Sequence, residues 1–223
     1  MLDLRLTKLI FVLTLLVAAA LLPSTARADV VAIGPAAFPG GSTLITFSGL
    51  ADGTEVNGLA TGGVVFSYSL GNGQLIIDGG PGVTNNISPG NIVSVGNNTG
   101  ILTVTLSGLS DRFGYGYAVL NTMPVGNATT ITLFNGVTNV GSLSYNGAPD
   151  PTFAGGFAGI FSTVPFNRVQ ISFNSTLAPA FALDNVRISA ANAVPEPATM
   201  LLLGTGLAGL AMKVRRRSQS YRA

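Results

Sequence analysis

The sequence contains no cysteine, no histidine and no tryptophan in 223 residues, and only 9% of its residues are charged. Without cysteine there is no disulfide and no thiol nucleophile, and without histidine there is no imidazole base. Zinc and the transition metals lose their usual ligands for the same reason. The chain is nevertheless 47% hydrophobic, which separates it from the polar, highly charged sequences typical of disordered proteins.

Lysine is absent from residues 29–194, and the charges of the chain are unevenly placed. Basic residues gather in the first 28 and the last 11 residues, whereas 29–194 holds three arginines and seven acidic residues, a formal charge of −4. Nucleic-acid binding depends on clustered Lys and Arg side chains that neutralise phosphates. We therefore expect no nucleic-acid partner.

The first 28 residues have the three-part pattern of a secretory signal peptide. A positively charged start precedes a 14-residue apolar run at 9–22, and Ala26 and Ala28 follow in an A-x-A arrangement. The run is short for a membrane span, and the small residues suit signal peptidase. We expect a signal helix within residues 1–28 that is removed after Ala28, so that the mature protein begins at Asp29.

The last 30 residues carry a second apolar segment with its own flanking signals. A charge-free stretch at 198–212 follows the tripeptide Pro195, Glu196, Pro197 and precedes a basic cluster that includes Arg215, Arg216 and Arg217. At about 1.5 Å per residue the stretch spans roughly 22 Å, less than the roughly 30 Å hydrocarbon core. The basic cluster favours a cytoplasmic end. The sequence therefore predicts a short C-terminal transmembrane helix suited to transient insertion in the inner membrane.

This ordered trio of Pro-Glu-Pro, apolar helix and arginine cluster resembles the PEP-CTERM sorting signal over residues 194–217. The resemblance implies a Gram-negative bacterial host, processing by an exosortase-type membrane protease, and sorting to the cell surface or its extracellular matrix. Residues 218–223 then form a cytoplasmic end. Signal peptidase and the exosortase are the expected processing partners, and the tail is a processing signal rather than a lasting anchor.

The sequence of residues 29–189 is typical of strands and turns. Short runs of Val, Ile, Thr, Phe and Tyr are separated by Gly, Asn, Asp and Pro, and apolar and polar residues alternate plainly in 102–106 and 169–173. The predicted strands are 43–48, 64–70, 74–78, 92–95, 101–107, 113–121, 129–134, 140–145, 156–162, 168–174 and 182–188. Asn-Gly pairs at 72–73, 135–136 and 146–147 predict turns.

Many short strands with frequent turns favour a sandwich or jelly roll. No linker or charge run divides residues 29–189. We therefore predict an all-β fold, with one jelly-roll-like β-sandwich domain at 29–189 and a short stalk at 190–193. The signal helix and the transmembrane helix flank this body.

Two stretches of the body resemble the lectin-like jelly rolls that often precede such a tail. Residues 45–56 with 63–66 resemble their opening strands, and 159–166 with 181–186 resemble their closing strands. The resemblance implies that an acidic residue of the first loop and the Asp of the closing strand share a structural cation. Ser48 stands here where an acidic residue is common.

Carboxylates and loop carbonyls suffice as calcium ligands. Asp52, Glu55 and Asp184 are the candidate ligands, because a sandwich can bring its first and last strands together. No D-x-D-x-D loop is present. A structural calcium ion is the one cofactor for which the sequence offers ligands.

Three aromatic residues, Phe113, Tyr115 and Tyr117, fall on one strand face at period two. They form either an exposed platform for a sugar ring or part of the core, where the intervening glycines would allow close packing. The sequence leaves both interpretations open, and aromatic residues are more often buried.

These observations predict a non-catalytic protein of the cell surface or extracellular matrix, acting in adhesion, biofilm formation or association with extracellular polysaccharide. The alternative is a lectin-like, carbohydrate-binding module with a defined sugar ligand. A glycoside hydrolase with a carboxylate pair is a third hypothesis. It is disfavoured because several acids stand beside turn residues, as in Asp52-Gly53 and Asp78-Gly79, where Asp usually bonds its own backbone.

Overall fold

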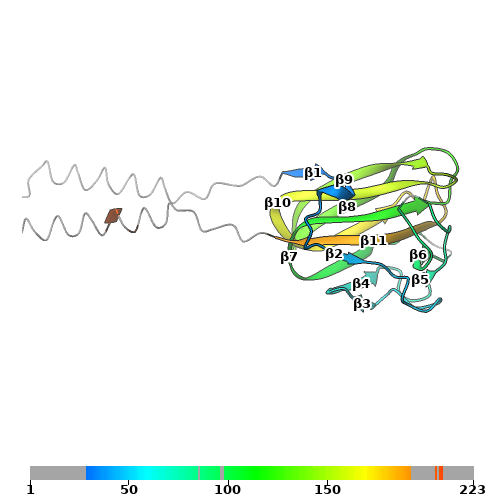
Figure 1. Ribbon diagram of the computed structural model, residues 1–223, viewed down its shortest axis with the longest axis horizontal. Helices are drawn as coiled ribbons and strands as arrows, with labels where there is room; N and C mark the ends of the chain where they lie inside the picture. Colours follow the sequence, from blue (N-terminus) through cyan, green and yellow to red (C-terminus); the bar gives the residue numbers. More distant parts are fainter. Residues whose placement is uncertain (1–28, 85, 96–97, 192–203, 205, 208–223) are drawn as a thin grey trace, which may run out of the picture.

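The computed structural model describes residues 29–84, 86–95, 98–191, 204 and 206–207, and its strands lie between Val30 and Ala190 (Figure 1). They are β1 (Val30–Ala32), β2 (Thr43–Ile45), β3 (Ala60–Thr61), β4 (Val64–Tyr68), β5 (Leu75–Asp78), β6 (Asn91–Ser94), β7 (Leu102–Val119), β8 (Val125–Asn135), β9 (Thr138–Pro149), β10 (Ala154–Phe173) and β11 (Phe181–Ala190). A 3-10 helix, η1 (Pro35–Ala37), follows β1. The predicted all-β class is confirmed.

The two predicted terminal helices lie outside the residues that the structure describes, apart from three helical positions at 204 and 206–207. Among the described residues, no helix combines the length and the apolar character needed to cross a membrane.

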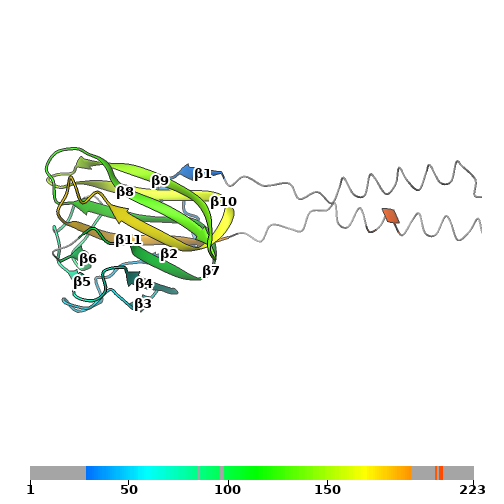
Figure 2. The same cartoon turned by 180° about the vertical axis from the view of Figure 1, so that it is seen from behind.

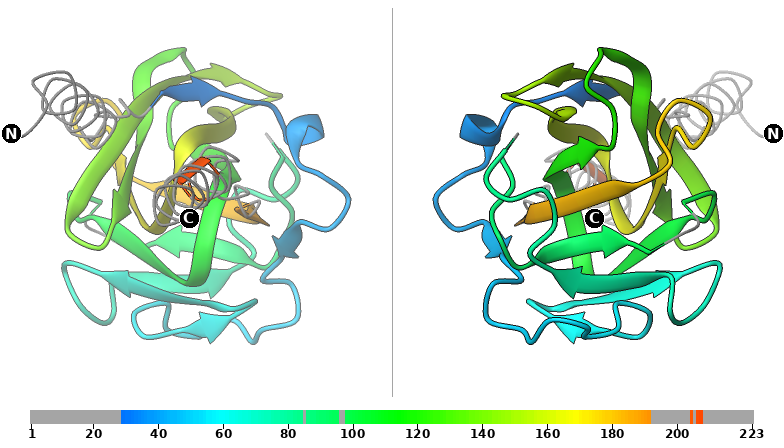
Figure 3. Two further views of the ribbon diagram at one scale, coloured as in Figure 1. Left: turned by 90° about the vertical axis from the view of Figure 1, so that its left-hand side faces the viewer. Right: turned by 90° about the vertical axis from the view of Figure 1, so that its right-hand side faces the viewer.

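All eleven strands belong to one continuous sheet that folds over on itself into two layers. Layer A has the order β3-β4-β7-β10-β8-β9 and uses residues 102–106 of β7 and 168–173 of β10. Layer B has the order β5-β6-β11-β7-β10-β1, with β2 on the second half of β11, and uses residues 110–119 of β7 and 154–162 of β10. Figure 2 shows the layers from behind, and Figure 3 shows the strands surrounding the interior from both ends.

The strands β7 and β10 belong to both layers because each turns a corner. The register between them shifts twice, after the pair Phe161–Arg112 and again between the pairs Phe166–Ser110 and Arg168–Thr105. At the corner of β10, the Ser162 hydroxyl accepts the N–H of Val164 at 3.1 Å and donates to the Val164 carbonyl oxygen at 2.7 Å. A serine at the corner therefore satisfies backbone groups of the bend.

The corners also explain a difference from the predicted strands. Residues 108–112 and 163–167 interrupt the hydrophobic alternation, so the sequence predicts one strand before and another after each interruption. The pairing instead continues past both interruptions, and the four predicted strands are two long ones. The predicted turn at 146–147 is wrong, because Gly147 pairs with Val125 inside β9.

The core fills the space between the layers. Phe173 in layer A has its ring centroid 6.5 Å from that of Tyr115 and 6.4 Å from that of Tyr117, both in layer B. On its other side, Phe173 stacks on Phe181 at 3.8 Å with nearly parallel rings. These contacts bury aromatic surface between the two layers and so hold the layers together.

Both chain ends leave the body at the end where the corners lie (Figure 1). The Asp29 N–H donates to Oγ1 of Thr163 at 3.1 Å, next to the corner of β10. The Ala191 N–H donates to the carbonyl oxygen of Leu109 at 3.0 Å, at the corner of β7. Consequently Asp29 and Ala191 lie at the same end of the body.

Candidate functional site

The residues predicted to direct export lie outside the described part of the chain. These are Ala26 and Ala28 of the signal-peptidase site, and Pro195, Glu196, Pro197, Arg215, Arg216 and Arg217 of the sorting signal.

The proposed sugar platform is wrong, because all three of its aromatic residues are core residues. Phe113 and Tyr115 are fully buried and Tyr117 is 1% exposed. Successive rings lie 6.0 and 6.2 Å apart in edge-to-face geometry. The glycines between them serve the close packing that the sequence suggested: a Cβ on Gly116 would overlap the carbonyl oxygen of Asn86.

The buried Tyr115 and Tyr117 and the half-buried Tyr145 each have a hydrogen-bond partner for the hydroxyl. Tyr115 shares a 2.6 Å bond with Thr129, Tyr117 donates to the carbonyl oxygen of Asn146 at 2.9 Å, and Tyr145 donates to that of Gly159 at 2.6 Å. Burial raises the pKa of all three phenols, that of Tyr117 to about 12. At neutral pH all three phenols therefore remain protonated, and each is held in place by its hydrogen bond.

The proposed calcium ligands do not come together. No group of three or more acidic side chains is placed to hold a metal ion anywhere in the described residues. Both carboxylate oxygens of Glu55 accept the N–H of Gly73, at 2.9 and 3.0 Å, and Asp52 is exposed in a turn. The expected trio of Asp52, Glu55 and Asp184 is therefore wrong.

Asp184 is the most buried carboxylate of the body, at 1% exposure. Its Oδ2 accepts the N–H of Ser88 at 3.0 Å, its Oδ1 accepts that of Asn185 at 2.6 Å, and the backbone of Phe47 contributes a third bond. Burial raises the pKa of Asp184, and these hydrogen bonds oppose the rise. N–H donors occupy the positions that a cation would need, so this carboxylate joins β11 to two loops.

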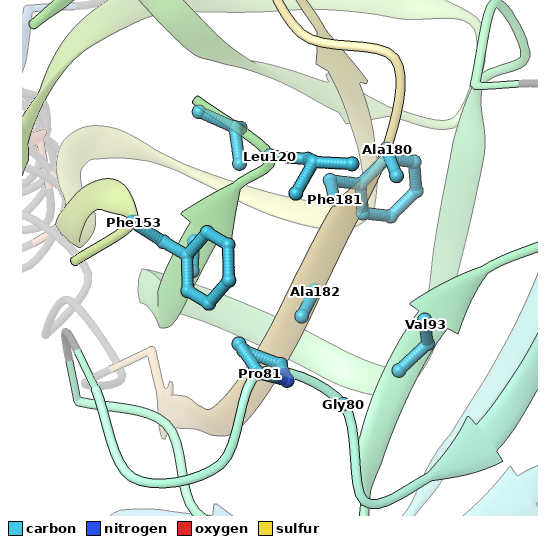
Figure 4. A pocket seen from close by; sticks show the side chains of 10 residues that line it. Gly80, Pro81, Val93, Leu120, Phe153, Ala180, Phe181 and Ala182 are labelled. Carbon is cyan, nitrogen blue, oxygen red and sulfur yellow. The ribbon is translucent and has the colours of Figure 1, made fainter. Parts of the chain in front are cut away.

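An apolar pocket opens beside the last residues of β7 and the first residues of β11 (Figure 4). It has a volume of about 210 Å³, and its lining includes Pro81, Val93, Leu120, Phe153 and Phe181. No polar side chain lines it. Ligand sites normally add a few polar groups that orient the ligand, and a sugar would need many of them. The pocket therefore does not fit a carbohydrate.

The strand register builds an extended, largely polar surface on the outer face of layer A. Outward residues of five neighbouring strands meet side by side, because each is the register partner of the next. One row is Ser67, Thr103, Gln170, Thr132 and Ser142, the second is Val65, Thr105, Arg168, Phe134 and Asn139, and the third is Ser172, Thr130 and Ser144. We call these residues the polar face of layer A.

The polar face of layer A is open to solvent, whereas the residues between its rows are core. Thr103, Thr132 and Gln170 are half-buried. Their strand neighbours, such as Val104 and Leu133, are fully buried. Hydroxyls pair across the strands, with Oγ1 of Thr130 2.8 Å from Oγ of Ser144 and Oγ1 of Thr132 3.0 Å from Oγ of Ser142.

Arg168 is the only charged residue in the strand segments that form this face. Its guanidinium carbon lies 4.6 Å from the ring centroid of Phe134. Within the described residues Arg168 has no ion pair, and its Nε atom is buried without a hydrogen-bond partner. The sequence gives the outward position of Thr103 and Gln170 through the alternation, but not the register that brings Phe134 to Arg168.

Comparison with known proteins identifies the tail. Residues 193–217 match the PEP-CTERM protein-sorting motif, as the sequence resemblance implied. The motif implies export, sorting to the surface through the membrane, and an exosortase as the processing partner. No curated protein matches the chain.

Among solved structures, the body is similar to family 29 carbohydrate-binding modules. One variant, studied for its mechanism of ligand recognition, is 11% identical with a TM-score of 0.38, covering 70% of this chain and 100% of that one. Another, complexed with cellulohexaose, is 9% identical with a TM-score of 0.36, covering 69% and 94%. At these scores the likeness says nothing about a ligand of the present chain.

Proposed function

We propose that this chain is an exported, non-catalytic β-sandwich protein that an exosortase sorts to the cell surface or extracellular matrix, where it associates with polysaccharide. The PEP-CTERM motif at 193–217 supports the sorting step. The polar face of layer A is the observation that carries the polysaccharide association, because it presents hydroxyl and amide groups from five adjacent strands.

The polar face has the chemistry that sugar hydroxyls need. Ser, Thr and Gln side chains both donate and accept hydrogen bonds, as sugar hydroxyls do. Five strands at a spacing of about 4.8 Å extend over roughly 19 Å, which suits a chain molecule better than a small ligand. A β-sheet also fixes the positions of these groups before binding, so little conformational entropy is lost.

On this proposal, residues 1–28 are a signal peptide that is removed after Ala28. Asp29, the residue after the proposed cleavage site, is already held on β10 through two bonds with Thr163: its N–H donates to the hydroxyl at 3.1 Å, and its carbonyl oxygen accepts the N–H at 3.1 Å. Cleavage after Ala28 leaves these bonds in place. Sequencing of the exported form should give Asp29 as the first residue, and Met1 there would contradict the proposal.

The tail acts as a processing signal on this proposal. Pro195 and Pro197 hold the backbone extended in front of the apolar segment 198–212, which suits binding in a protease active site. Transient insertion of that segment in the inner membrane places Glu196 near its outer surface, and Arg215–Arg217 keep the end of the chain in the cytoplasm.

Mass spectrometry of protein from the cell surface tests the sorting step. The mature chain should end upstream of the arginine cluster, Glu196→Gln should block cleavage, and deletion of Arg215–Arg217 should impair retention and processing. Lys213→Gln, which changes one charge outside the arginine run, is the matched control and should be processed normally. A surface form that still ends at Ala223 in a host with an active exosortase would contradict the proposal.

A glycan array probed with the full-length chain tests the polysaccharide association. Saturable binding that Thr132→Ala with Gln170→Ala weakens would support it. Thr43→Ala, at an exposed position of β2 in layer B, serves as the control and should bind normally. Loss of binding in both variants, or no binding to any polysaccharide, would contradict the proposal. Turnover of a polysaccharide that ends on replacing one Asp would contradict the non-catalytic assignment.

A further inference from the structure

We propose that Arg168, seated on the ring of Phe134, binds an anionic group of a polysaccharide, so that the polar face of layer A takes acidic rather than neutral polysaccharide. This inference rests on the proposed association with polysaccharide and names the class of polysaccharide. The ligand of this proposal is a polysaccharide whose sugars carry carboxylates.

The position of Arg168 is fixed by the sheet and by an aromatic ring. Its strand register places it between Thr105 on β7 and Phe134 on β8, and its guanidinium carbon lies 4.6 Å from the Phe134 centroid. A guanidinium held over an aromatic ring loses less freedom when it binds a ligand, and cation–π attraction adds to its stability there.

The positive charge of Arg168 is also without a negatively charged partner among the described residues. Within the described part of the chain this side chain makes no ion pair, and no acidic residue occurs in the strand segments of layer A around it. Its Nε is buried, so the terminal Nη atoms of the half-buried side chain are the donors left for a ligand. A carboxylate matches a guanidinium with two parallel hydrogen bonds and opposite charge. An acidic sugar therefore supplies what this arginine lacks, whereas a neutral hydroxyl supplies no charge.

The surroundings of Arg168 suit the rest of the sugar chain. Thr105 adjoins it in its own row, and Thr103, Gln170 and Thr132 adjoin in the next row. All are uncharged donors and acceptors, so they can bind hydroxyls without repelling a carboxylate on a neighbouring sugar. No acidic residue lies in the strand segments that form this face, so the repulsion from the body's acids acts from other segments.

A second arginine of the same kind provides an internal control. Arg112 lies 5.0 Å from the ring centroid of its register partner Phe161, in layer B. It differs in having an acidic partner, since its Nη1 lies 3.4 Å from Oδ2 of Asp111. Its charge is thus already balanced, and we expect it to contribute little to binding.

The experiment measures binding of the full-length chain to two forms of one polymer, polygalacturonate and its fully methyl-esterified form. The wild type should prefer the carboxylate form, and added salt should weaken that preference. Arg168→Gln should weaken binding to polygalacturonate by about tenfold or more, the loss expected for one charge-assisted pair, and should leave binding to the ester unchanged. Arg112→Gln should bind as the wild type does.

Arg168→Lys sharpens the test because it keeps the charge and loses the planar fork. Unlike Arg168→Gln, it should keep part of the wild type's preference for polygalacturonate over the methyl ester. If Arg168→Gln does not fold, judged by its melting temperature, Phe134→Leu replaces it: loss of the ring should lower the preference for polygalacturonate by a smaller factor.

The outcomes separate this inference from the proposed function. Equal binding of both polymer forms, unaffected by Arg168→Gln, would overturn the role of Arg168 while the polysaccharide association stands. Equal losses in Arg168→Gln and Arg112→Gln would also overturn it, as an effect of net charge alone. A wild type that binds sulfated but not carboxylated polymer would show that the anion was wrongly assigned. Failure to bind any polysaccharide would contradict the proposed function itself.

Discussion

The outer faces of the two layers differ, although β7 and β10 run through both. Before its corner, β7 presents Thr103 and Thr105 to solvent. After it, the outward positions are small and covered: Gly116 lies against the Asn86 carbonyl, and Ala118 packs with Ile87 in a second apolar cluster. Layer B is thus buried on both faces over much of its area, whereas layer A keeps an open polar face.

Folding constrains the covered residues on the outer face of layer B, whereas the exposed residues of the polar face of layer A can contact a ligand. A covered face constrains side-chain size, because protein interiors are packed densely and added volume has nowhere to go. An open face of an antiparallel sheet carries no such constraint, and polar side chains are usual there, so its residues can take a second role. The proposed association with polysaccharide is that role.

The largest effect should come from adding one methyl group to the covered face. In Gly116→Ala, the new Cβ would overlap the backbone carbonyl of Asn86, which cannot rotate away as a flexible side chain would. We expect a loss of roughly 3 kcal/mol, the upper part of the range for overpacking. Urea denaturation measures it.

Gly108→Ala is the matched control in the same strand. Gly108 lies at the corner of β7, its backbone does not have a positive φ, and a Cβ there would meet nothing within 4 Å. Its stability should equal or slightly exceed that of the wild type, since alanine reduces the entropy of the unfolded chain. A small effect at Gly116 would show that the segment around Asn86 does not cover layer B.

The next effect should come from Asp184, which connects layer B to its covering loops. Asp184→Asn replaces an acceptor oxygen by an N–H donor that faces backbone N–H groups, so a buried bond is lost at a cost of roughly 2 kcal/mol. Asp52→Asn, at an exposed position, should change little. Equal stability of Asp184→Asn and wild type would contradict the hydrogen bonding described.

The pH dependence of this loss follows from the raised pKa of Asp184. Folding raises the affinity of the carboxyl group for its proton, so protonation of Asp184 favours the folded state, and this contribution is fully present below the ordinary Asp pKa of about 3.9. That contribution falls as the pH rises through the folded-state value. The difference between wild type and Asp184→Asn should therefore narrow from acid toward neutral pH in urea titrations.

Three tyrosines with raised pKa values test whether water is excluded from the space between the layers. Burial raises the pKa of Tyr115, Tyr117 and Tyr145, so folded protein resists their ionisation and loses stability as the pH rises above about 10. Ultraviolet absorbance should show Tyr117 titrating near pH 12 in folded protein, and near 10 in urea. Coincident titrations in both conditions would contradict the burial.

Much of the fold could be predicted from the sequence, because the alternation in 102–106 and 169–173 carries the pattern of a half-buried strand. The corners could not, since residues 108–112 combine Gly, Ser and charged residues as a loop would. Their serine hydroxyls nevertheless satisfy the bend, and the strand pairing continues. Strands as short as β1 and β3 leave too few residues for any alternation.

The candidate site depended on information that the sequence does not carry. Residues Thr105, Phe134 and Arg168 are far apart in the chain and meet only through the register of three strands. The candidate site that the sequence offered was the aromatic segment 113–117. Its alternate glycines were the signal that both faces of that segment are covered, and therefore that its rings lie in the core.

The smallest effect on stability should come from the polar face of layer A. Thr103→Val with Thr132→Val removes two hydroxyls, keeps the branched shape that strands favour, and adds no volume that meets a neighbour across the layers. Stability should change by no more than about 0.5 kcal/mol, the usual range for surface positions. Binding to polygalacturonate should fall, because two hydrogen-bonding groups next to Arg168 are gone. A large loss of stability would instead mean that the hydroxyl pairs, such as Thr132 with Ser142, hold layer A together, and the polar face would then be explained by folding alone.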